Sequence, residues 1–352
     1  MKVAIYTIAL NEEQHVERWY ESSKEADYHI IADTGSSDNT VKRATDLGIT
    51  VVKIGISPFR FDDARNASLA AVPLDADLCI SMDMDELLLP GWREELEKGF
   101  KKGITRPSYR FIYAWNEDGT PSEEFNGFKI HARKNYRWKY PIHEVIDPYM
   151  TQETKGFIGL EMWHKPDNSK SRGQYLPMLE MAVAEEPSSR NLYYYGRELY
   201  YKQRYEEAAK TLKAYLEISK FPEERGYAYR ILSKCEPDMA EEYLIRSTEE
   251  FSSRESILAL ANHYYHKQMW DECYLVAKKS LDFKKKSLNF MSEYWAWSHM
   301  PYDLVAISAW QLGKWKDAYK YGKQAVEITP NDERLVKNLE FYKSKVNNAN
   351  TK

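Results

Sequence analysis

The sequence predicts an α/β domain with a mostly parallel sheet, followed by a domain built only from helices. In the first half, short apolar runs alternate with amphipathic segments, a pattern typical of βα units with right-handed crossovers. From about residue 169 onward only helices are predicted. Two apolar runs that end in acidic residues, at 31–33 and 80–86, carry the strongest functional signal.

The composition bounds the class of protein. The chain has 352 residues, 43% hydrophobic and 30% charged, so about two packed domains are expected. A net charge of −4 provides no basic field, which excludes nucleic acid as an expected partner. The three cysteines are odd in number and widely spaced, which favours a reducing, cytoplasmic setting. No run reaches the roughly 18 apolar residues that a transmembrane segment needs.

The elements of the first half follow from apolar runs and the turn residues that bound them. Strands are expected at 3–10, 28–33, 49–54 and 77–82, with helices at 12–24, 40–47, 62–71 and 90–100. Gly48 is a C-cap residue, and Pro90 takes the favoured first-turn position of its helix. Further strands without intervening helices, at 108–115, 127–133 and 156–163, predict an added mixed or antiparallel region.

The second half repeats a helical pattern. Within 190–216, Gly196, Tyr200 and Ala208 fill a small, an aromatic and a small position, and the pattern resembles a tetratricopeptide repeat. A similar spacing of small and aromatic residues recurs at 225–251, 261–281 and 311–330. Stacked repeats expose a concave face, so acceptor binding or a homodimer is expected beside a purely structural role. The predicted domains are 1–168 for catalysis, 169–188 as a helical linker, 189–346 as repeats and 347–352 as a disordered tail.

Acidic residues follow two of the predicted strands. Asp33 ends one strand, and Asp83, Asp85 and Glu86 follow another. In an open α/β sheet, ligands bind beyond the carboxyl ends of the strands. Neighbouring carboxylates repel one another unless a cation joins them, and Mg²⁺ or Mn²⁺ commonly binds one or two carboxylates plus substrate phosphates. The alternative is a polar strand end leading into a helix, whose N-terminus favours acidic residues.

Four motifs, in this order and spacing, resemble those of family-2 glycosyltransferases with the GT-A fold. They are Asn11-Glu12, the run 33–40, the segment 61–66 and the DXD-type motif 83–86. The resemblance covers residues 1 to about 166, and fusion of such a domain to tetratricopeptide repeats is a known arrangement. It implies a metal-dependent, inverting transfer of a sugar from a nucleotide-diphosphate donor, foremost a UDP-sugar. The acceptor, whether a glycan, a protein or a small molecule, is not specified.

The resemblance also implies roles for individual residues. Asp33 is expected to accept hydrogen bonds from the base, and Gly35 lets the backbone approach the nucleotide. Asp85 is expected to bind Mn²⁺ or Mg²⁺, Asp83 the ribose or the metal, and His164 to complete the metal site, although a lone histidine is more often structural. Arg65 is expected to pair with phosphate or base, the alternative being an ion pair with Asp62. Donor contacts are implied at Thr7, Ala9, Asn11, Glu12, Asp33, Gly35, Arg65 and Asp83.

Two ionisable residues, His143 and Glu144, interrupt the apolar stretch 140–146, a costly place unless they are paired or functional. Glu144 is the candidate general base, with His143 beside it; alternatively, both tie the added strands to the sheet. The chain has no clear Glu-Asp pair of the kind that many family-2 members use as a base motif. The fallback bases lie on the 116–126 loop: Asp118, Glu123 and Glu124.

Two other function classes stay open. A nucleotidyltransferase shares a nucleotide-binding sheet and acidic metal ligands, but it normally needs a basic triphosphate loop where this chain has the acidic segment 8–13. A repeat-based adaptor with an inactive transferase domain is the second alternative, and the intact acidic cluster argues against it. Metal-dependent binding of a donor analogue separates the enzyme from the adaptor.

Overall fold

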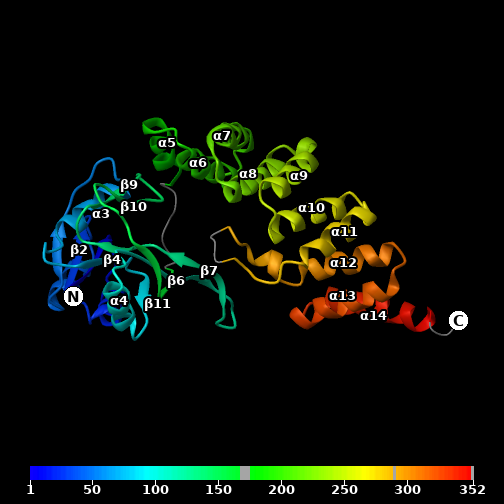
Figure 1. Ribbon diagram of the computed structural model, residues 1–352, viewed down its shortest axis with the longest axis horizontal. Helices are drawn as coiled ribbons and strands as arrows, with labels where there is room; N and C mark the ends of the chain where they lie inside the picture. The colour runs from blue at the N-terminus through cyan, green and yellow to red at the C-terminus, as the bar shows by residue number, and fades with distance from the viewer. Residues whose placement is uncertain (167–174, 288–290, 350–352) are drawn as a thin grey trace. The chain divides into compact units, whose positions relative to one another are not determined.

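A computed structural model describes residues 1–166, 175–287 and 291–349 of the chain, which divides into two compact units. The first, Met1–Glu186, holds mixed α/β sheets, and the second, Pro187–Lys352, is helical (Figure 1). The expected succession of an α/β domain and a helical domain is therefore present. The predicted boundary at 168 and residues 169–174 of the predicted linker lie outside the described residues. The described part of that linker forms α5 (Tyr175–Glu185), which belongs to the first unit.

The central sheet of the first unit has the strand order β3-β2-β1-β4-β8. Its parallel members are β1 (Val3–Ala9), β2 (Tyr28–Asp33), β3 (Thr50–Lys53) and β4 (Leu78–Ser81), and β8 (Ile130–Ala132) is antiparallel to β4. The connecting helices are α1 (Val16–Ser23), α2 (Thr40–Asp46) and α3 (Phe61–Ala70). Ala9 pairs with Asp33, and Tyr6 pairs with Ser81. The carboxyl ends of β1, β2 and β4 therefore meet at one edge, as the βα pattern predicts.

A second sheet has the order β5-β11-β6-β7. Its strands are β5 (Glu86–Leu88), β6 (Arg106–Trp115), β7 (Pro121–Gly127) and β11 (Lys155–His164), and α4 (Trp92–Lys101) packs on β11. A hairpin is formed by β9 (Tyr136–Lys139) and β10 (Val145–Pro148). The structure corrects the expected loop at 116–126, since residues 121–126 belong to β7, which pairs with β6. It also corrects the strand expected at 127–133, which is limited to 130–132.

Two predicted helices begin later than expected, for local reasons. The helix predicted from residue 12 begins at Val16, because the preceding segment is held by the start of α2: the Glu12 amide donates to Thr40 Oγ1 at 2.7 Å. The helix predicted from Pro90 begins at Trp92, because Gly91 has a left-handed backbone with φ of 87°. A residue in that conformation cannot belong to a right-handed helix.

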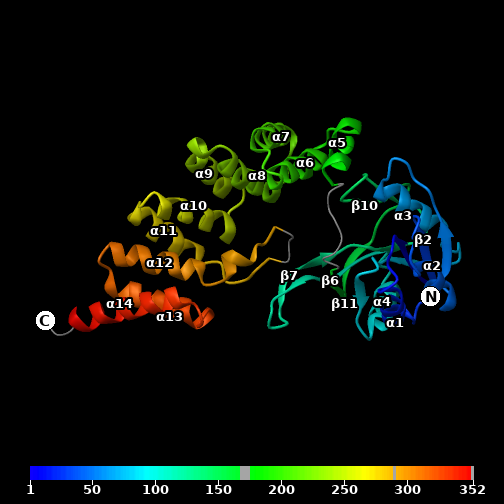
Figure 2. The same ribbon diagram turned by 180° about the vertical axis from the view of Figure 1, so that it is seen from behind.

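The second unit is a succession of paired helices (Figure 2). They are α6 (Ser189–Tyr201), α7 (Tyr205–Ile218), α8 (Pro222–Cys235), α9 (Ala240–Glu250), α10 (Arg254–His266), α11 (Trp270–Ser280), α12 (Met300–Gln311), α13 (Trp315–Ile328) and α14 (Glu333–Ala349), with 3₁₀ turns η1 (Pro237–Met239) and η2 (Tyr294–Trp297). Gly196 shows why small residues recur: a Cβ there would lie 2.7 Å from Leu212 Cγ. Of the tail predicted at 347–352, α14 includes residues up to Ala349, and 350–352 lie outside the described residues. None of the helices in the described ranges has both the length and the apolar character that crossing a bilayer demands.

Stability of the first unit is expected to fall on acidification through one histidine. His131 on β8 is fully buried; its Nε2 lies 2.8 Å from the Tyr6 hydroxyl and its Nδ1 lies 2.7 Å from the Ala132 carbonyl oxygen. Burial lowers the pKa of His131 to about 3. Between that value and the unfolded pKa of ~6.5, only the unfolded chain binds the proton, so stability is lost as pH falls below ~6.5, by up to ~1.4 kcal/mol per pH unit.

Chemical denaturation near pH 7 and near pH 5 measures this loss, and His131→Gln is expected to reduce it by about 2 kcal/mol relative to the wild type. His266→Gln, at an exposed position of α10, is the matched control. An unchanged pH dependence in His131→Gln would show that protonation of His131 does not limit acid stability.

Candidate functional site

The loops after β1 and β2 interlock at the edge where the parallel strands end. Asn11, which has a left-handed φ of 54°, accepts the Ser37 amide at 2.8 Å, and its own amide donates to Ser36 Oγ at 2.9 Å. Gly35 has a φ of 113°, and no atom lies within 4 Å of where a Cβ would be. The backbone at Gly35 is therefore open to close approach, as expected for a glycine at this position. Together these contacts give the edge a defined rim.

Three of the residues predicted to contact the sugar donor are buried: Thr7, Ala9 and Asp33. Asp33 is only 2% exposed, and its carboxylate accepts the Gly35 amide at 3.3 Å and the Ser36 amide at 3.1 Å. Its observed role is to shape the turn. The side chain of Thr7 has no exposed surface, and its backbone carbonyl oxygen accepts a hydrogen bond from Ser68 Oγ at 2.7 Å. Ala9, at the end of β1, is also buried. The structure therefore places the side chains of Thr7 and Ala9 in the core, and their contact with a donor stays a prediction.

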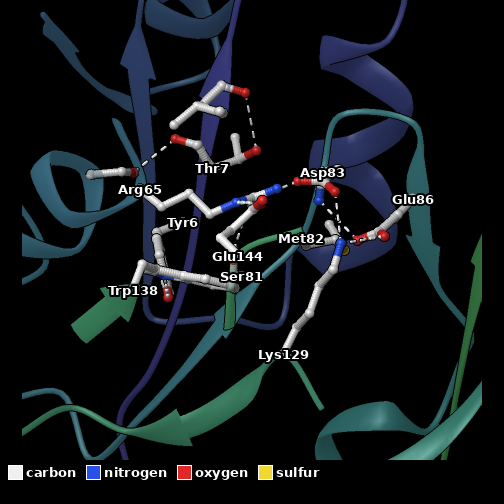
Figure 3. A network of polar contacts seen from close by, with 12 residues as sticks. Tyr6, Thr7, Arg65, Ser81, Met82, Asp83, Glu86, Lys129, Trp138 and Glu144 are labelled. Carbon is white, nitrogen blue, oxygen red and sulfur yellow. Dashed lines mark hydrogen bonds and ion pairs between the residues drawn. The ribbon is translucent and has the colours of Figure 1, made fainter. Parts of the chain in front are cut away.

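A network of alternating charges surrounds Asp83, which follows the carboxyl end of β4 (Figure 3). Arg65 on α3 donates through Nε to Glu144 Oε1 at 2.5 Å, and its Nη1 lies 2.8 Å from Asp83 Oδ1. Asp83 Oδ2 and Glu86 Oε1 each lie 2.6 Å from the Lys129 ammonium. The Arg65 guanidinium also lies 5.0 Å from the ring centroid of Trp138. Five ionic side chains from four separate segments are thus joined in one network.

Because these charged side chains are largely buried, leaving one of them without a partner would cost free energy. Arg65 is 5% exposed and Glu86 is 2% exposed, so each depends on its partners for charge compensation. Burial alone would raise the pKa of Asp83, but Arg65 and Lys129 outweigh it and hold that pKa well below its usual range. For Glu86 burial prevails over the Lys129 ammonium, and its pKa is raised. The alternative of an ion pair between Arg65 and Asp62 is not found, because Asp62 pairs with Arg60 at 3.0 Å.

Asp85 and His164 form a second, separate pair. His164 ends β11, and its Nε2 lies 3.3 Å from Asp85 Oδ2. The Nδ1 of His164 lies 3.0 Å from the Tyr113 carbonyl oxygen, and the imidazole stacks on the Tyr113 ring at a centroid distance of 4.8 Å. Burial opposes the charged imidazole, but the contacts with Asp85 and with the Tyr113 carbonyl oxygen outweigh it and raise the pKa of His164. A cation bound here would take the place of the Nε2 proton, while Nδ1–H would still donate to the Tyr113 carbonyl oxygen. This is the arrangement in which histidine ligands are usually held.

These residues fit a divalent cation that is completed by a substrate. Within the described ranges, no three His, Cys, Asp or Glu side chains gather into a metal-binding group. The set of Asp83, Asp85 and His164 stays a prediction: Asp85 lies beside His164, whereas the Asp83 carboxylate is engaged by Arg65 and Lys129. One carboxylate and one imidazole suffice where phosphate oxygens supply the remaining ligands.

The predicted bases are mostly engaged by other groups. Glu144 pairs with Arg65 through its Oε1. His143 has a left-handed φ of 50°, and its ring lies edge-on to that of Tyr175. Glu124 pairs with Arg110 at 2.7 Å. Asp118 accepts the Thr120 amide at 2.9 Å in the turn after β6, and Glu123 is exposed on β7.

Lys129 and Trp138 are the components of the site that sequence reasoning missed. Lys129 neutralises both Asp83 and Glu86, and Trp138 supports the Arg65 guanidinium. The available signal for Lys129 was weak: a single cation directly before the buried strand β8. Trp138 lies on β9, a four-residue strand whose pairing with β10 the sequence did not predict.

Comparisons with known proteins give limited information. No family model matches the chain, and no curated protein matches it. Among solved structures, pilF of Pseudomonas aeruginosa is 19% identical over 48% of this chain and 72% of that chain, with a TM-score of 0.38. MamA of AMB-1 is 17% identical over 45% of this chain and 82% of the MamA chain, with a TM-score of 0.36.

A third similar structure is glucosyl-3-phosphoglycerate synthase of Mycobacterium tuberculosis, in complex with Mn²⁺, uridine diphosphate and glucosyl-3-phosphoglycerate. It is 27% identical over 32% of this chain, with a TM-score of 0.27, and the match spans 44% of the synthase. All three TM-scores are below 0.5 and do not establish a shared fold.

Proposed function

We propose that the first unit is a metal-dependent glycosyltransferase that moves a sugar from a nucleotide-diphosphate donor, foremost a UDP-sugar, to an acceptor. The observation that carries this proposal is the Asp85–His164 pair. Its imidazole is oriented by the Tyr113 carbonyl oxygen, and Asp85 follows a strand whose carboxyl end lies at the same sheet edge as the interlocked loops after β1 and β2. That combination suits a diphosphate and a cation bound together.

Each part of the site has a role in this proposal. Asp85 and His164 would hold Mn²⁺ or Mg²⁺, which supplies positive charge to the departing diphosphate. Arg65, held by Glu144 and Asp83, and Lys129, held by Asp83 and Glu86, keep two fixed cations beside the strand ends. Because Asp83, Glu86 and Glu144 compensate these two charges, the role of the network in this proposal is to fix the segment that carries Asp85. Asn11 and Gly35 belong to the rim that the nucleotide would contact, and the buried Glu12 follows Asn11 in the chain.

The proposed reaction still requires a base for the acceptor hydroxyl. Because Glu144, Glu124 and Asp118 are engaged by other groups, Glu123 is the carboxylate that we assign to this role. It is exposed on β7 and is paired in register with Ala114. The repeats would bind the acceptor or a second copy of the chain, because stacked helical repeats expose extended surfaces.

Thermal unfolding in the presence of nucleoside diphosphates tests the proposal directly. UDP with Mn²⁺ is expected to raise the unfolding midpoint of the first unit more than UDP or Mn²⁺ alone, because a ligand that binds only the folded state stabilises it. ADP and GDP with Mn²⁺ are the matched controls for the base. Failure of every diphosphate to act together with Mn²⁺ would favour the repeat-based adaptor with an inactive domain.

Glu144→Gln separates a base from a positioning residue. If Glu144 positions Arg65, losing its charge is expected to weaken donor binding and transfer together, by about 10-fold, as for other residues that orient binding groups. If Glu144 were the base, donor binding would stay unchanged while transfer fell by ~10²- to 10⁴-fold. Measuring donor affinity and transfer rate on the same preparation distinguishes the two roles. Glu124→Gln, which breaks the exposed pair with Arg110, is the control.

A further inference from the structure

A cavity in the second unit lies at the beginning of α10 (Arg254–His266). Figure 1 labels this helix. Its volume is about 110 Å³, far above the roughly 15 Å³ that a single water molecule requires. Its walls include Tyr227 and Arg230 from α8, Arg254 from α10 and Trp297 from η2. The cavity is therefore large enough for a polyatomic group and is lined by several hydrogen-bond donors.

Arg254 is the unusual side chain of this cavity. It is 7% exposed, and its Nε is buried without a hydrogen-bond partner. The guanidinium carbon lies 4.5 Å from the ring centroid of Trp297, which supports the charged plane from one side. A buried guanidinium carries five donors and always bears a positive charge, so an unpartnered Nε leaves part of its desolvation cost uncompensated. A bound acceptor of hydrogen bonds would offset that cost.

Two carboxylates line the cavity, Glu223 and Glu255, and Glu255 is hydrogen-bonded to neighbouring groups. Glu255 Oε1 accepts from Trp297 Nε1 at 2.8 Å, from Ser292 Oγ at 3.1 Å and from the Glu293 amide at 3.2 Å. Glu293 itself pairs with Arg230. Glu255 Oε1 and Glu293 are thus engaged by these groups, whereas the buried Nε of Arg254 has no hydrogen-bond partner in the described part of the chain.

The start of α10 adds a second attraction for negative charge. α10 has 13 residues, and Ser253 caps it by accepting the Ser256 amide at 3.1 Å. The first amides of a helix and its dipole favour an anion at this end. Lys285 also lines the cavity and is exposed, which gives a cationic approach from solvent.

We infer that this cavity is a binding site for an oxyanion, a phosphate or carboxylate group carried by a ligand of the repeats. Arg254 would donate to the anion from within, the start of α10 would face it, and Lys285 would attract it. The inference rests on the second unit alone and does not depend on the proposed transferase activity.

Titration of the full-length protein with inorganic phosphate, by calorimetry and by thermal unfolding at constant ionic strength, tests this site. Phosphate is expected to bind and to raise the unfolding midpoint relative to chloride, and acetate in a parallel titration distinguishes a phosphate site from a carboxylate site. Arg254→Met is expected to weaken binding at least about 10-fold, since charge-assisted hydrogen bonds are lost.

A second pair of variants keeps the test decisive if Arg254→Met does not fold. Lys285→Gln is expected to weaken binding several-fold. Lys284→Gln, which removes the same charge from the neighbouring residue, is expected to change little, because Lys284 Nζ donates to the Leu281 carbonyl oxygen. Binding of neither anion to the wild type, or equal effects of Lys284→Gln and Lys285→Gln, would overturn the inference. A donor-binding failure in the first unit would leave these results unaffected.

Discussion

Replacing Asp85 by asparagine is expected to remove manganese-dependent binding of UDP while the protein stays folded. The substitution keeps the size of the side chain but removes the one negative charge of the Asp85–His164 pair. Loss of an outer partner of a metal site commonly costs 10- to 100-fold in affinity, so loss of a direct ligand is expected to cost at least about 100-fold. Calorimetric titration of UDP in the presence and absence of Mn²⁺ measures the effect.

The fold should tolerate this change for a local reason. The Asp85 carboxylate is 21% exposed, and the contact that holds this turn to β11 uses the Asp85 carbonyl oxygen, which accepts the Lys165 amide at 2.7 Å. Asp63→Asn, an equal change of charge at an exposed position on α3, is the matched control. Unchanged UDP affinity of Asp85→Asn in Mn²⁺ would refute the assignment of Asp85 as a metal ligand.

Arg65→Met is expected to be among the most destabilising single substitutions in the first unit. Arg65 compensates both Glu144 and Asp83, whose side chains are 12% and 31% exposed. Removing one partner of a buried ion pair leaves an uncompensated charge and costs about 3–5 kcal/mol. The free energy of unfolding, measured by chemical denaturation, should fall by that amount. Arg65→Lys should recover only part of the loss, because an ammonium cannot reproduce the two directions of a guanidinium.

Two further variants test whether the loss of stability in Arg65→Met comes from the broken ion-pair network. Arg43→Met breaks an exposed pair with Glu17 and is expected to cost at most about 1 kcal/mol. The double variant Arg65→Met/Glu144→Gln removes both charges of one pair, and the two effects are expected to be non-additive because the residues are in contact. If Arg65→Met costs no more than Arg43→Met, charge compensation by Arg65 does not stabilise this unit.

The regular elements of the first unit were predictable where local signals agree. The predicted strand 28–33 has the bounds of β2, and the predicted helix 40–47 differs from α2 by one residue. An apolar run ending at Asp33, and a helix ended by Gly48 with its φ of 78°, are signals contained within a few residues. Their positions could therefore be inferred without knowledge of any distant contact.

The short strands of the second sheet and of the hairpin could not be predicted in this way. β5 has three residues, and its Leu88 pairs with Met162, far along the chain. β7 has the sequence PSEEFNG, which is mostly polar and typical of a loop. Both segments become strands because they pair with β11 and β6, so their structure depends on tertiary contacts that override local preference.

For the candidate site, the sequence by itself determined that Asp33 and the acidic residues after β4 come to one edge, because parallel strands of βα units end at the same edge of a sheet. Only the tertiary structure decided which charged side chains form ion pairs with one another. Arg65 meets Glu144 across 79 positions of the chain, and Lys129 meets Asp83 across 46. Ion pairing acts over a few ångströms, so partners so far apart in sequence are set by the packing of α3, β4 and the segment before β8, which no local pattern encodes.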